Sequence, residues 1–322
     1  MKKYIIAIDE GTSSVRAVAF DITKNQIVLS RKEKLNTYYP HPGWVEQDAE
    51  EIFQKAKACL DDVLSNIDPT LVFGIGITNQ RETTVLWNKK SGIPTNRAIS
   101  WQCRRTADQI SVLSTKQKSY IQKTTGLIPD AYFSATKIRW ILDNNKKAAN
   151  LQQNKNLCAG TIDSFLVFRL TNKKSFVTDI TNASRTMLLN IKTGKWDDEL
   201  LSMFGVDKQI LPTVVENNQI VGYYNFDGEQ IPIAGICGDQ QSSLFGQMCF
   251  KKGNIKITYG TGSFMLLNIG SELLFSKHKL VTTVALKLKN KPICYAVEGS
   301  IFNCGTAVDW LEKIGLTHGP KD

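Results

Sequence analysis

The sequence predicts a mixed α/β fold that contains two related strand-rich units. Short apolar runs rich in β-branched residues alternate with segments in which apolar residues recur at helical spacing. A strand, a turn rich in glycine, threonine and serine, and a return strand occur at 4–20 and again at 255–269. We interpret this recurrence as an internal duplication, with a chance recurrence of turn residues as the alternative. The chain contains neither G-x-x-x-x-G-K-[ST] nor a G-x-G-x-x-G between a strand and a helix, so any nucleotide would bind at hairpin turns.

Length and composition are those of an ordinary globular protein of about two domains. The chain has 322 residues, of which 42% are hydrophobic and 22% charged, and this excludes a disordered or fibrous chain. No apolar run approaches the ~18 residues of a membrane helix. The apolar residues before Asp9 are too few for a signal-peptide core. We therefore expect a cytoplasmic protein without membrane insertion.

The charge of the chain is basic but dispersed. There are 40 lysines and arginines against 30 aspartates and glutamates, which gives a formal net charge of +10. The lysine pairs form no basic cluster with a known nucleic-acid module, so we interpret them as a solvated surface and expect no nucleic-acid partner. The seven cysteines contain no C-x-x-C pair and the three histidines are isolated, so neither a disulfide framework nor a metal-ligand set is indicated.

The first 80 residues predict a meander, a helix and a buried strand. Apolar runs at 4–8, 15–20 and 27–29 are typical of three consecutive strands. Asp48 is placed to cap a helix, and Glu51 three residues later would complete a capping box. Asp68-Pro69 ends that helix, and a buried strand follows at 72–78.

Further helices and strands follow along the chain. Helical spacing predicts helices around 104–114, 134–148, 161–170 and 197–204. Apolar runs predict strands at 231–236, 255–259, 264–269 and 295–297, and the last of these leads into Glu298-Gly299 and a helix at 305–314.

The segment Asp9-Glu10-Gly11-Thr12-Ser13-Ser14-Val15-Arg16 follows the first strand. Its glycine allows a tight turn, and backbone N–H groups and hydroxyls can donate to phosphate oxygens. Arg16 could add a bidentate phosphate contact, and a carboxylate at the strand end could hold a hydrated Mg²⁺. A plain hairpin turn is the alternative.

Arg81 and Glu82 follow the strand at 72–78 and place donors beside acceptors. This combination suits a polyol, because each hydroxyl needs both. A surface ion pair is the alternative. Trp101 and Tyr132-Phe133 could form an apolar wall, although aromatic side chains are more often core.

Asp239 follows a glycine at the end of the strand at 231–236. A carboxylate in this place can reach a cleft and accept a proton from a hydroxyl. The alternative is that it caps the next helix.

Taken together, these segments resemble the FGGY family of carbohydrate kinases, and within it the members that phosphorylate glycerol. The stretches that carry the resemblance run from residue 6 to residue 311: IAIDEGTSSVRAV (6–18), YPHPGWVEQDAEEI (39–52), GIGITNQRETTVLW (74–87), ISWQCRRTAD (99–108), FSATKIRWILD (133–143), TDITNASRTMLLNI (178–191), AGICGDQQSSLFGQ (234–247), TYGTGSFMLLNIG (258–270) and YAVEGSIFNCGTAVDWL (295–311).

The resemblance implies an actin-like, ribonuclease-H-like fold and ATP-dependent phosphorylation of glycerol to sn-glycerol 3-phosphate with Mg²⁺. It implies that Asp239 is the general base. The glycerol-binding residues it implies are Arg81, Glu82, Trp101, Tyr132, Asp239, Gln240 and Phe264. Another sugar kinase of the family is the alternative, but the segments around Arg81 and Trp101 resemble the glycerol kinases more than the pentulose kinases.

The resemblance also implies a nucleotide and metal site. Its phosphate and nucleotide contacts would be Thr12, Ser13, Ser14, Arg16, Thr261, Gly305 and Asp309, and its metal ligands Asp9 and Asp239. Two residues of this nucleotide and metal site depart from the family's pattern. Glu10 stands where the family usually has glutamine, and Asp309 stands where a glutamine often contacts the nucleotide.

The largest departure is at the end, because family chains continue well beyond this point. We expect residues 1–248 to form a complete glycerol-binding domain and residues 249–322 an incomplete start of the nucleotide-binding domain. The two hypotheses are a working kinase and a polyol-binding remnant, or half of a split enzyme, without turnover. A homo-oligomer or a complementing C-terminal chain is a possible partner.

Overall fold

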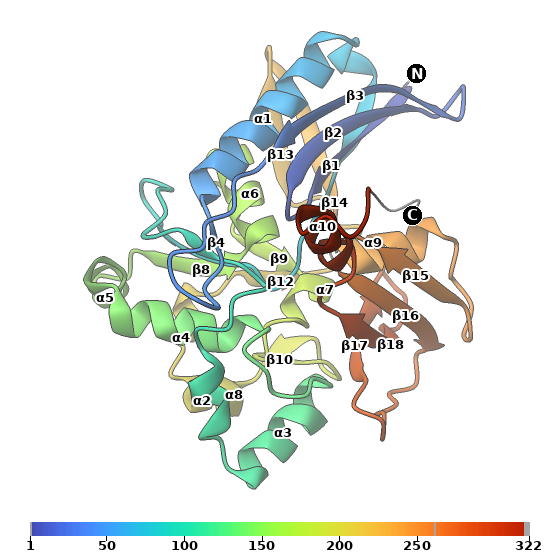
Figure 1. The fold of residues 1–322 in the computed structure, drawn as a ribbon. Helices are drawn as coiled ribbons and strands as arrows, with labels where there is room; N and C mark the ends of the chain where they lie inside the picture. The colour runs from blue at the N-terminus through green and yellow to red at the C-terminus, as the bar shows by residue number, and fades with distance from the viewer. Residues whose placement is uncertain (1, 261, 319–322) are drawn as a thin grey trace.

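The first sheet has six strands and organises the N-terminal part of the molecule. The computed structural model describes residues 2–260 and 262–318. The strands of the first sheet lie in the order β13-β14-β5-β1-β2-β3 (Figure 1). Their bounds are β1 Tyr4–Glu10, β2 Ser14–Asp21, β3 Gln26–Lys34, β5 Val72–Asn79, β13 Gly222–Phe226 and β14 Glu229–Gly238. The three central strands β1, β5 and β14 are parallel, so their carboxyl ends meet at one edge of the sheet.

Two helices cover one face of the first sheet. α1 (Ala49–Ser65) and α6 (Ile162–Leu170) pack on it (Figure 1). Eight residues of α1 are buried, at the helical spacing that the sequence shows. Asp48 caps α1 as predicted, since its side chain accepts from the N–H groups of Glu50 and Glu51. The predicted capping box is wrong, because the Glu51 carboxylate pairs instead with Lys55 and Asn36.

A second sheet and several helices complete the N-terminal part. The second sheet has the order β4-β7-β6-β8 and is antiparallel. Its strands are β4 Glu46–Gln47, β6 Thr84–Asn88, β7 Ala98–Ile99 and β8 Leu157–Thr161. The helices are α2 Ala107–Ser111, α3 Thr115–Thr125, α4 Ser134–Asn144, α5 Lys146–Gln153, α7 Ile180–Ala183 and α8 Asp198–Phe204. Short 3-10 turns lie at Pro69–Leu71 and Lys208–Ile210, and two-stranded sheets pair β10 Leu189–Asn190 with β11 Lys195–Trp196 and β9 Val177–Asp179 with β12 Thr213–Val215.

A third sheet follows α9 (Asp239–Gly246) and lies beside the first part (Figure 1). It is antiparallel in the order β15-β16-β18-β17. Its strands are β15 Ile255–Tyr259, β16 Ser263–Gly270, β17 Val281–Leu286 and β18 Cys294–Ile301, and α10 (Gly305–Lys313) comes after them. Buried side chains of this sheet, such as Phe264 and Leu266, join the same core as Trp101 and Tyr132. The third sheet is therefore packed on the first part.

The predicted elements differ from the structure in several places, and strands such as β6, β8 and β17 were not predicted at all. The predicted helix at 134–148 is two helices, because Asn145 ends α4 in an extended conformation and caps α5. α3 was not predicted, although Ser114 and Gln117 form a capping box and Gly126 ends the helix in the left-handed conformation. The helix predicted to run to Asp68 ends at Ser65, and Glu298 lies inside β18 rather than after it. No helix among the described residues is long and apolar enough to span a membrane.

Candidate active site

A polar cavity lies where the carboxyl ends of β1, β5 and β14 face the third sheet. Its volume is about 350 Å³. It is lined by residues from both sides, namely Asp9, Gly11, Thr12, Gln80, Arg81, Glu82, Trp101, Tyr132, Asp239, Gln240, Thr258, Gly260, Gly262 and Phe264. The parallel register explains the meeting point, because Glu10 and Gly238 both lie opposite Asn79 at the ends of their strands. The chain thus places three polar segments, far apart in sequence, at one sheet edge.

Arg81, Glu82 and Asp239 form the charged side of the cavity. The Arg81 Nε lies 3.4 Å from Asp239 Oδ1 and 3.9 Å from Glu82 Oε1. Gly238 permits this arrangement, since a Cβ there would lie 2.9 Å from Arg81 Cδ. The alternative of a surface ion pair at Arg81 and Glu82 is wrong, because their side chains are each 1% exposed.

The backbone of Glu82 is held in an unfavourable conformation. Its φ of 60° lies in the left-handed region, which is costly for a residue other than glycine. Ser134 Oγ, Lys137 Nζ and Thr84 Oγ1 donate to the Glu82 carbonyl oxygen at 3.1, 3.2 and 3.0 Å. Strain of this kind persists where the surroundings over-determine it, and it is frequent at functional sites.

Lys137 anchors two cavity residues through their backbone. Besides the Glu82 carbonyl, its Nζ donates to the Tyr132 carbonyl oxygen at 2.7 Å. Burial lowers the pKa of Lys137 to about 7. Lys137 is therefore an exception to the expectation that lysines form a solvated surface.

Burial is also the main influence on the pKa of Asp239. It raises the pKa of this carboxyl above its ordinary value, while the guanidinium of Arg81 opposes the rise. The predicted alternative, that Asp239 caps a helix, holds in part. Gly238 occupies the cap position of α9 and Asp239 is its first residue, but the Asp239 carboxylate accepts from the N–H of Gln240 in the first turn at 2.7 Å.

Aromatic side chains form the opposite wall of the cavity. Trp101, Tyr132 and Phe264 are 5 to 7% exposed. The Trp101 ring meets those of Tyr132 and Phe264 edge to face, each at 5.9 Å between centroids. Trp101 Nε1 donates to Thr12 Oγ1 at 2.9 Å, which orients the indole across the cavity.

The structure brings together all of the residues predicted for glycerol and the metal, along with Thr12 of the predicted phosphate contacts. Asp9, Thr12, Arg81, Glu82, Trp101, Tyr132, Asp239, Gln240 and Phe264 all line the cavity. Arg16 does not line the cavity, but it contacts a residue that does, since its Nη2 donates to Asp9 Oδ2 at 2.7 Å across the first hairpin.

Several predicted nucleotide contacts lie elsewhere. Ser13, Ser14, Gly305 and Asp309 are not part of the cavity lining. Gly305 begins α10, where its N–H donates to the Gly260 carbonyl oxygen at 2.9 Å, and Asp309 is exposed on that helix. Thr261 lies outside the described residues.

Three charged residues near the cavity were missed by sequence reasoning. Lys256 contacts the Gln240 side chain and donates to Thr258 Oγ1 at 2.9 Å, and burial lowers its pKa to about 8. Arg185 and Glu298 lie buried behind Arg81 and Glu82. The available signal was a charged residue within an apolar run, as in Ile255-Lys256-Ile257 and Ala296-Val297-Glu298, because such a residue is either paired or functional when buried.

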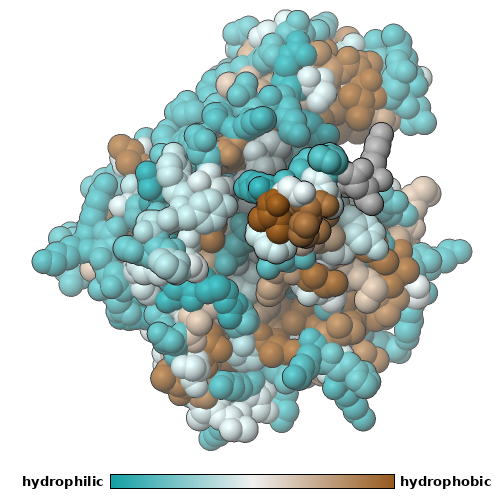
Figure 2. All heavy atoms as spheres, in the orientation of Figure 1, coloured by the Kyte–Doolittle hydropathy of each residue, from teal (hydrophilic) through white to brown (hydrophobic). Residues whose placement is uncertain are grey.

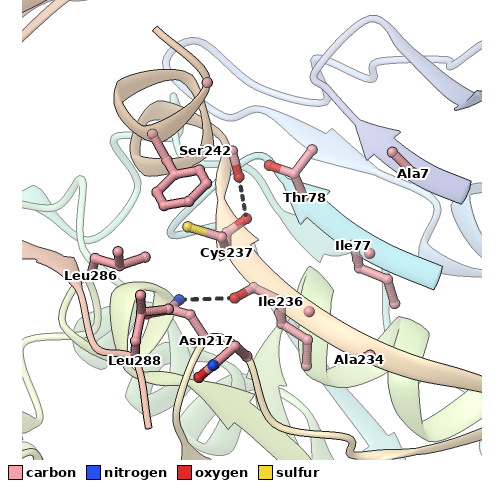
Figure 3. A pocket seen from close by; sticks show the side chains of 15 residues that line it. Ala7, Ile77, Thr78, Asn217, Ala234, Ile236, Cys237, Ser242, Leu286 and Leu288 are labelled. Atoms are coloured by element: carbon pink, nitrogen blue, oxygen red, sulfur yellow. Dashed lines mark hydrogen bonds between the residues drawn. The ribbon is translucent and has the colours of Figure 1, made fainter. Parts of the chain in front are cut away.

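A second pocket, of about 380 Å³, has a different character (Figure 3). Its floor is formed by the first sheet at Ala7, Ile77 and Ala234, and its walls include Leu286 and Leu288. Two of the polar side chains drawn there donate to backbone carbonyl oxygens, Asn217 Nδ2 to Ile236 at 2.9 Å and Ser242 Oγ to Cys237 at 3.3 Å, whereas the buried Thr78 hydroxyl has no hydrogen-bond partner in the part of the chain that the structure describes. No charged side chain lines it among the described residues, in contrast to the polar cavity.

Comparison with known proteins supports a family assignment. The family model "FGGY family of carbohydrate kinases, N-terminal domain" matches residues 4–246. A glycerol kinase of Clostridium perfringens is 49% identical over 318 residues, covering 97% of this chain and 63% of that relative. A glycerol kinase of Brachyspira hyodysenteriae is 48% identical, covering 100% of this chain and 66% of the relative. The chain thus spans a little under two thirds of the length of these curated relatives.

Solved structures agree on the fold. The crystal structure of Plasmodium falciparum glycerol kinase with ADP is 34% identical and has a TM-score of 0.90, covering 99% of this chain and 65% of that one. A ligand-bound xylulose kinase from Lactobacillus acidophilus has a TM-score of 0.83 at 21% identity, covering 97% and 62%, and shows the fold alone. The predicted actin-like α/β fold is confirmed.

Proposed function

We propose that this chain, which belongs to the FGGY family of carbohydrate kinases, binds glycerol in the polar cavity and acts in its ATP-dependent phosphorylation to sn-glycerol 3-phosphate. The main support is that one cavity combines a guanidinium, carboxylates and an aromatic wall. A polyol needs donors and acceptors for its hydroxyls and an apolar surface for its carbon atoms. The similarity to glycerol kinases at 49% and 48% identity favours glycerol over other sugars of the family.

In this proposal, the cavity residues divide the work of holding glycerol. Arg81 donates to hydroxyl oxygens, and the carboxylates of Glu82 and Asp239 accept from hydroxyl hydrogens. Tyr132 and Gln240 add hydrogen bonds, while Trp101 and Phe264 pack on the carbon chain. A substrate without the hydroxyls would leave buried polar groups unpaired, and this makes such a site selective.

Asp239 would be the general base. It accepts the proton of the reacting hydroxyl as that oxygen bonds to the γ-phosphorus and the bond from phosphorus to the ADP oxygen breaks. Burial raises the pKa of Asp239, which makes its carboxylate a stronger base than an exposed one, and Arg81 opposes the rise so that the ionised form stays accessible. Because the transition state of phosphoryl transfer is loose, positioning contributes more than proton removal.

The residues present fit a magnesium nucleotide at the phosphate end of the cavity. Asp9 and Asp239 line the same cavity and carry the oxygen ligands that Mg²⁺ prefers. The described residues hold no group of three or more metal-binding side chains. That suits an ion bound by one or two carboxylates, water and substrate phosphates. Mg²⁺, when bound, would neutralise charge on the phosphates.

The nucleotide contacts would come from two turns and α10. Thr12, Ser13, Ser14 and Arg16 of the first hairpin would donate to phosphate oxygens. Thr261, Gly305 and Asp309 would contact the rest of the nucleotide. In this division residues 1–248 form the glycerol-binding domain, and residues 249–322 belong to the nucleotide-binding domain.

A second candidate is a chain that binds glycerol without turnover. It is favoured by α10, which has no buried residue and carries the predicted contact Asp309 on an exposed face. A second copy of this chain, or a chain that supplies the remaining third of a family member, would then complete the nucleotide site.

The deciding experiment measures ATP-dependent phosphorylation of glycerol by the purified chain, with Asp239→Asn as the matched control and xylulose as a second substrate. We expect glycerol turnover that falls by about 10²–10⁴-fold in Asp239→Asn, the range of a general base. Calorimetric glycerol affinity should change little in the variant, because an asparagine keeps an acceptor at that place.

Each outcome separates the candidates. Turnover that disappears in the variant supports the kinase, and glycerol binding without turnover supports the binding-only chain. Equal turnover in the variant would contradict the role of Asp239. A preference for xylulose would contradict the choice of glycerol.

A further inference from the structure

A buried ring of four charges lies directly behind the polar cavity. Two of its members, Arg81 and Glu82, line the cavity, and the other two, Arg185 and Glu298, do not. Arg185 Nε lies 2.6 Å from Glu82 Oε1, and Arg185 Nη2 lies 2.7 Å from Glu298 Oε1. Arg81 Nη1 lies 2.6 Å from Glu298 Oε2 and its Nη2 lies 3.1 Å from Oε1. All four side chains are at most 1% exposed.

Glu298 accepts hydrogen bonds from one edge of the Arg81 guanidinium and does not contact the other edge. A guanidinium carries five N–H donors in a rigid fork. Glu298 occupies the end formed by Nη1 and Nη2, and Gln241 Oε1 lies 3.3 Å from Nη1. The side formed by Nε–H and the second Nη2–H remains, and Asp239 Oδ1 lies 3.4 Å from that Nε. The free edge of Arg81 is therefore the edge beside the proposed base.

Arg185 likewise pairs with only one side of the Glu82 carboxylate. It donates to Oε1 of that carboxylate, and none of the described residues donates to Oε2. One oxygen of Glu82 is thus fixed by the protein and the other is left for a hydroxyl. The ring holds two positive and two negative charges, so its burial needs no further counter-ion.

Hydrogen bonds to the first sheet position the turn that precedes Arg185. It follows α7, whose first turn is capped by the Asp179 carboxylate. In that turn, Asn182 exchanges hydrogen bonds with Asn79 at 2.9 and 3.1 Å, and Asn79 lies two residues before Arg81. Glu298, in contrast, comes from β18 of the third sheet, 217 residues from Arg81. The ring therefore joins the two parts of the molecule at the substrate cavity.

We propose that Arg185 and Glu298 are positioning residues that fix Arg81 and Glu82 with one edge free for the polyol, so that glycerol affinity depends on the docking of the third sheet. This inference rests on the proposed function, because it names what arranges the proposed glycerol site. It gives a role to the TDITNASR segment and to the glutamate of YAVEGS.

The test measures the calorimetric dissociation constant of glycerol for the purified chain and two variants. Arg185→Lys keeps the charge but cannot reach two different carboxylates with a fixed fork. The double variant Arg185→Met with Glu298→Gln removes both positioning residues and keeps the ring neutral, so it guards against a misfolded single variant. We expect both to weaken glycerol binding by about 10-fold to 100-fold, the effect of a misplacement near 1 Å.

The matched control is Glu272→Gln, because Glu272 follows the third sheet's β16 and pairs with Lys252 in solvent at 2.9 Å. We expect no change of glycerol affinity there. Unchanged glycerol affinity in Arg185→Lys would show that charge balance alone matters and would overturn the inference. Unchanged affinity in the double variant would overturn it as well. If the unaltered chain binds no glycerol, the proposed function fails together with the inference.

Discussion

The molecule divides into two regions that bury their apolar side chains to different extents. In residues 2–248 the helix α1 buries eight of its residues, whereas α10 in residues 249–318 buries none. The second region is much shorter than the first but, among the described residues, carries nearly as many exposed large hydrophobic side chains, eleven against twelve: Phe250, Ile255, Ile257, Tyr259, Leu274, Phe275, Ile301, Phe302, Trp310, Ile314 and Leu316. Figure 2 shows hydrophobic surface over α10 and over the third sheet.

The difference shows that the region with the better buried core is not the only one that contributes residues to the cavity. The core between the first sheet and its helices contains buried residues of the first region only, while the third sheet shares a core with that region and contacts it through bonds such as the one from Thr282 N to the Gly126 carbonyl oxygen at 2.9 Å. Yet the second region supplies Phe264 and Glu298 to the cavity and its buried ring. Large exposed apolar patches are typical of interaction surfaces.

The largest effect on stability is expected in the core of the first region. Trp87 is fully buried and meets Phe165, Phe168 and Phe176 at ring distances of 5.4 to 5.6 Å. Trp87→Ala should lower the free energy of unfolding by about 3–5 kcal/mol, because it removes a large buried side chain and leaves a cavity. Urea unfolding followed by far-UV circular dichroism measures this. A loss below about 1 kcal/mol would contradict a sealed first core.

The buried glutamate that links the regions should show an acid-dependent effect. Burial alone would raise the pKa of Glu298, but Arg185 and Arg81 lower it to about 2 from the ordinary 4.5. Its contribution to stability is therefore complete above pH 4.5 and is lost as the pH falls towards 2. Glu298→Gln should cost about 3 kcal/mol at pH 6, the low end for breaking a buried ion pair. In urea titrations the difference from the unaltered chain should shrink below pH 4.5, and a constant difference would contradict the ring.

Glu10 in the first region should behave in the opposite way. It is buried, burial raises its pKa well above 4.5, and its partner Gln80 is uncharged. Between pH 4.5 and that raised pKa, the folded state binds more protons than the unfolded state, so stability falls as the pH rises. Glu10→Gln removes this loss. The variant should be more stable than the unaltered chain at pH 7 in thermal unfolding, with the gap closing towards pH 4.5; a less stable variant at pH 7 would refute the assignment.

The smallest effect is expected on α10. Trp310 is 58% exposed, so Trp310→Ala should change the free energy of unfolding by no more than about 0.5 kcal/mol. It is the matched counterpart of Trp87→Ala, with the same chemical change in the other region. Urea unfolding of the two variants side by side gives the comparison directly. A loss at Trp310 as large as that at Trp87 would show that α10 is packed against a partner surface in solution.

Sequence patterns located the segments that line the cavity because their signals are local. The strands that lead to Asp9, to Arg81-Glu82 and to Gly238-Asp239 are visible as apolar runs that are followed by polar residues. The failures were of two kinds. Asn145 ends one helix and begins the next within a single run of helical spacing, and α3 consists largely of polar and β-branched residues, so its capping box and Gly126 were the remaining signals.

Local sequence patterns indicated many of the strands and helices, the polar segments at strand ends and the similarity to a kinase family, because each of these rests on residues close together in the chain. That Arg81, Glu82, Arg185 and Glu298 form one neutral buried ring followed only from the tertiary structure. Glu298 lies 217 residues from Arg81 and 113 from Arg185. Spacing along the chain carries no information about such a meeting. The charges are brought together by the parallel register of β1, β5 and β14 and by the docking of the third sheet, and low-dielectric burial makes their pairing obligatory.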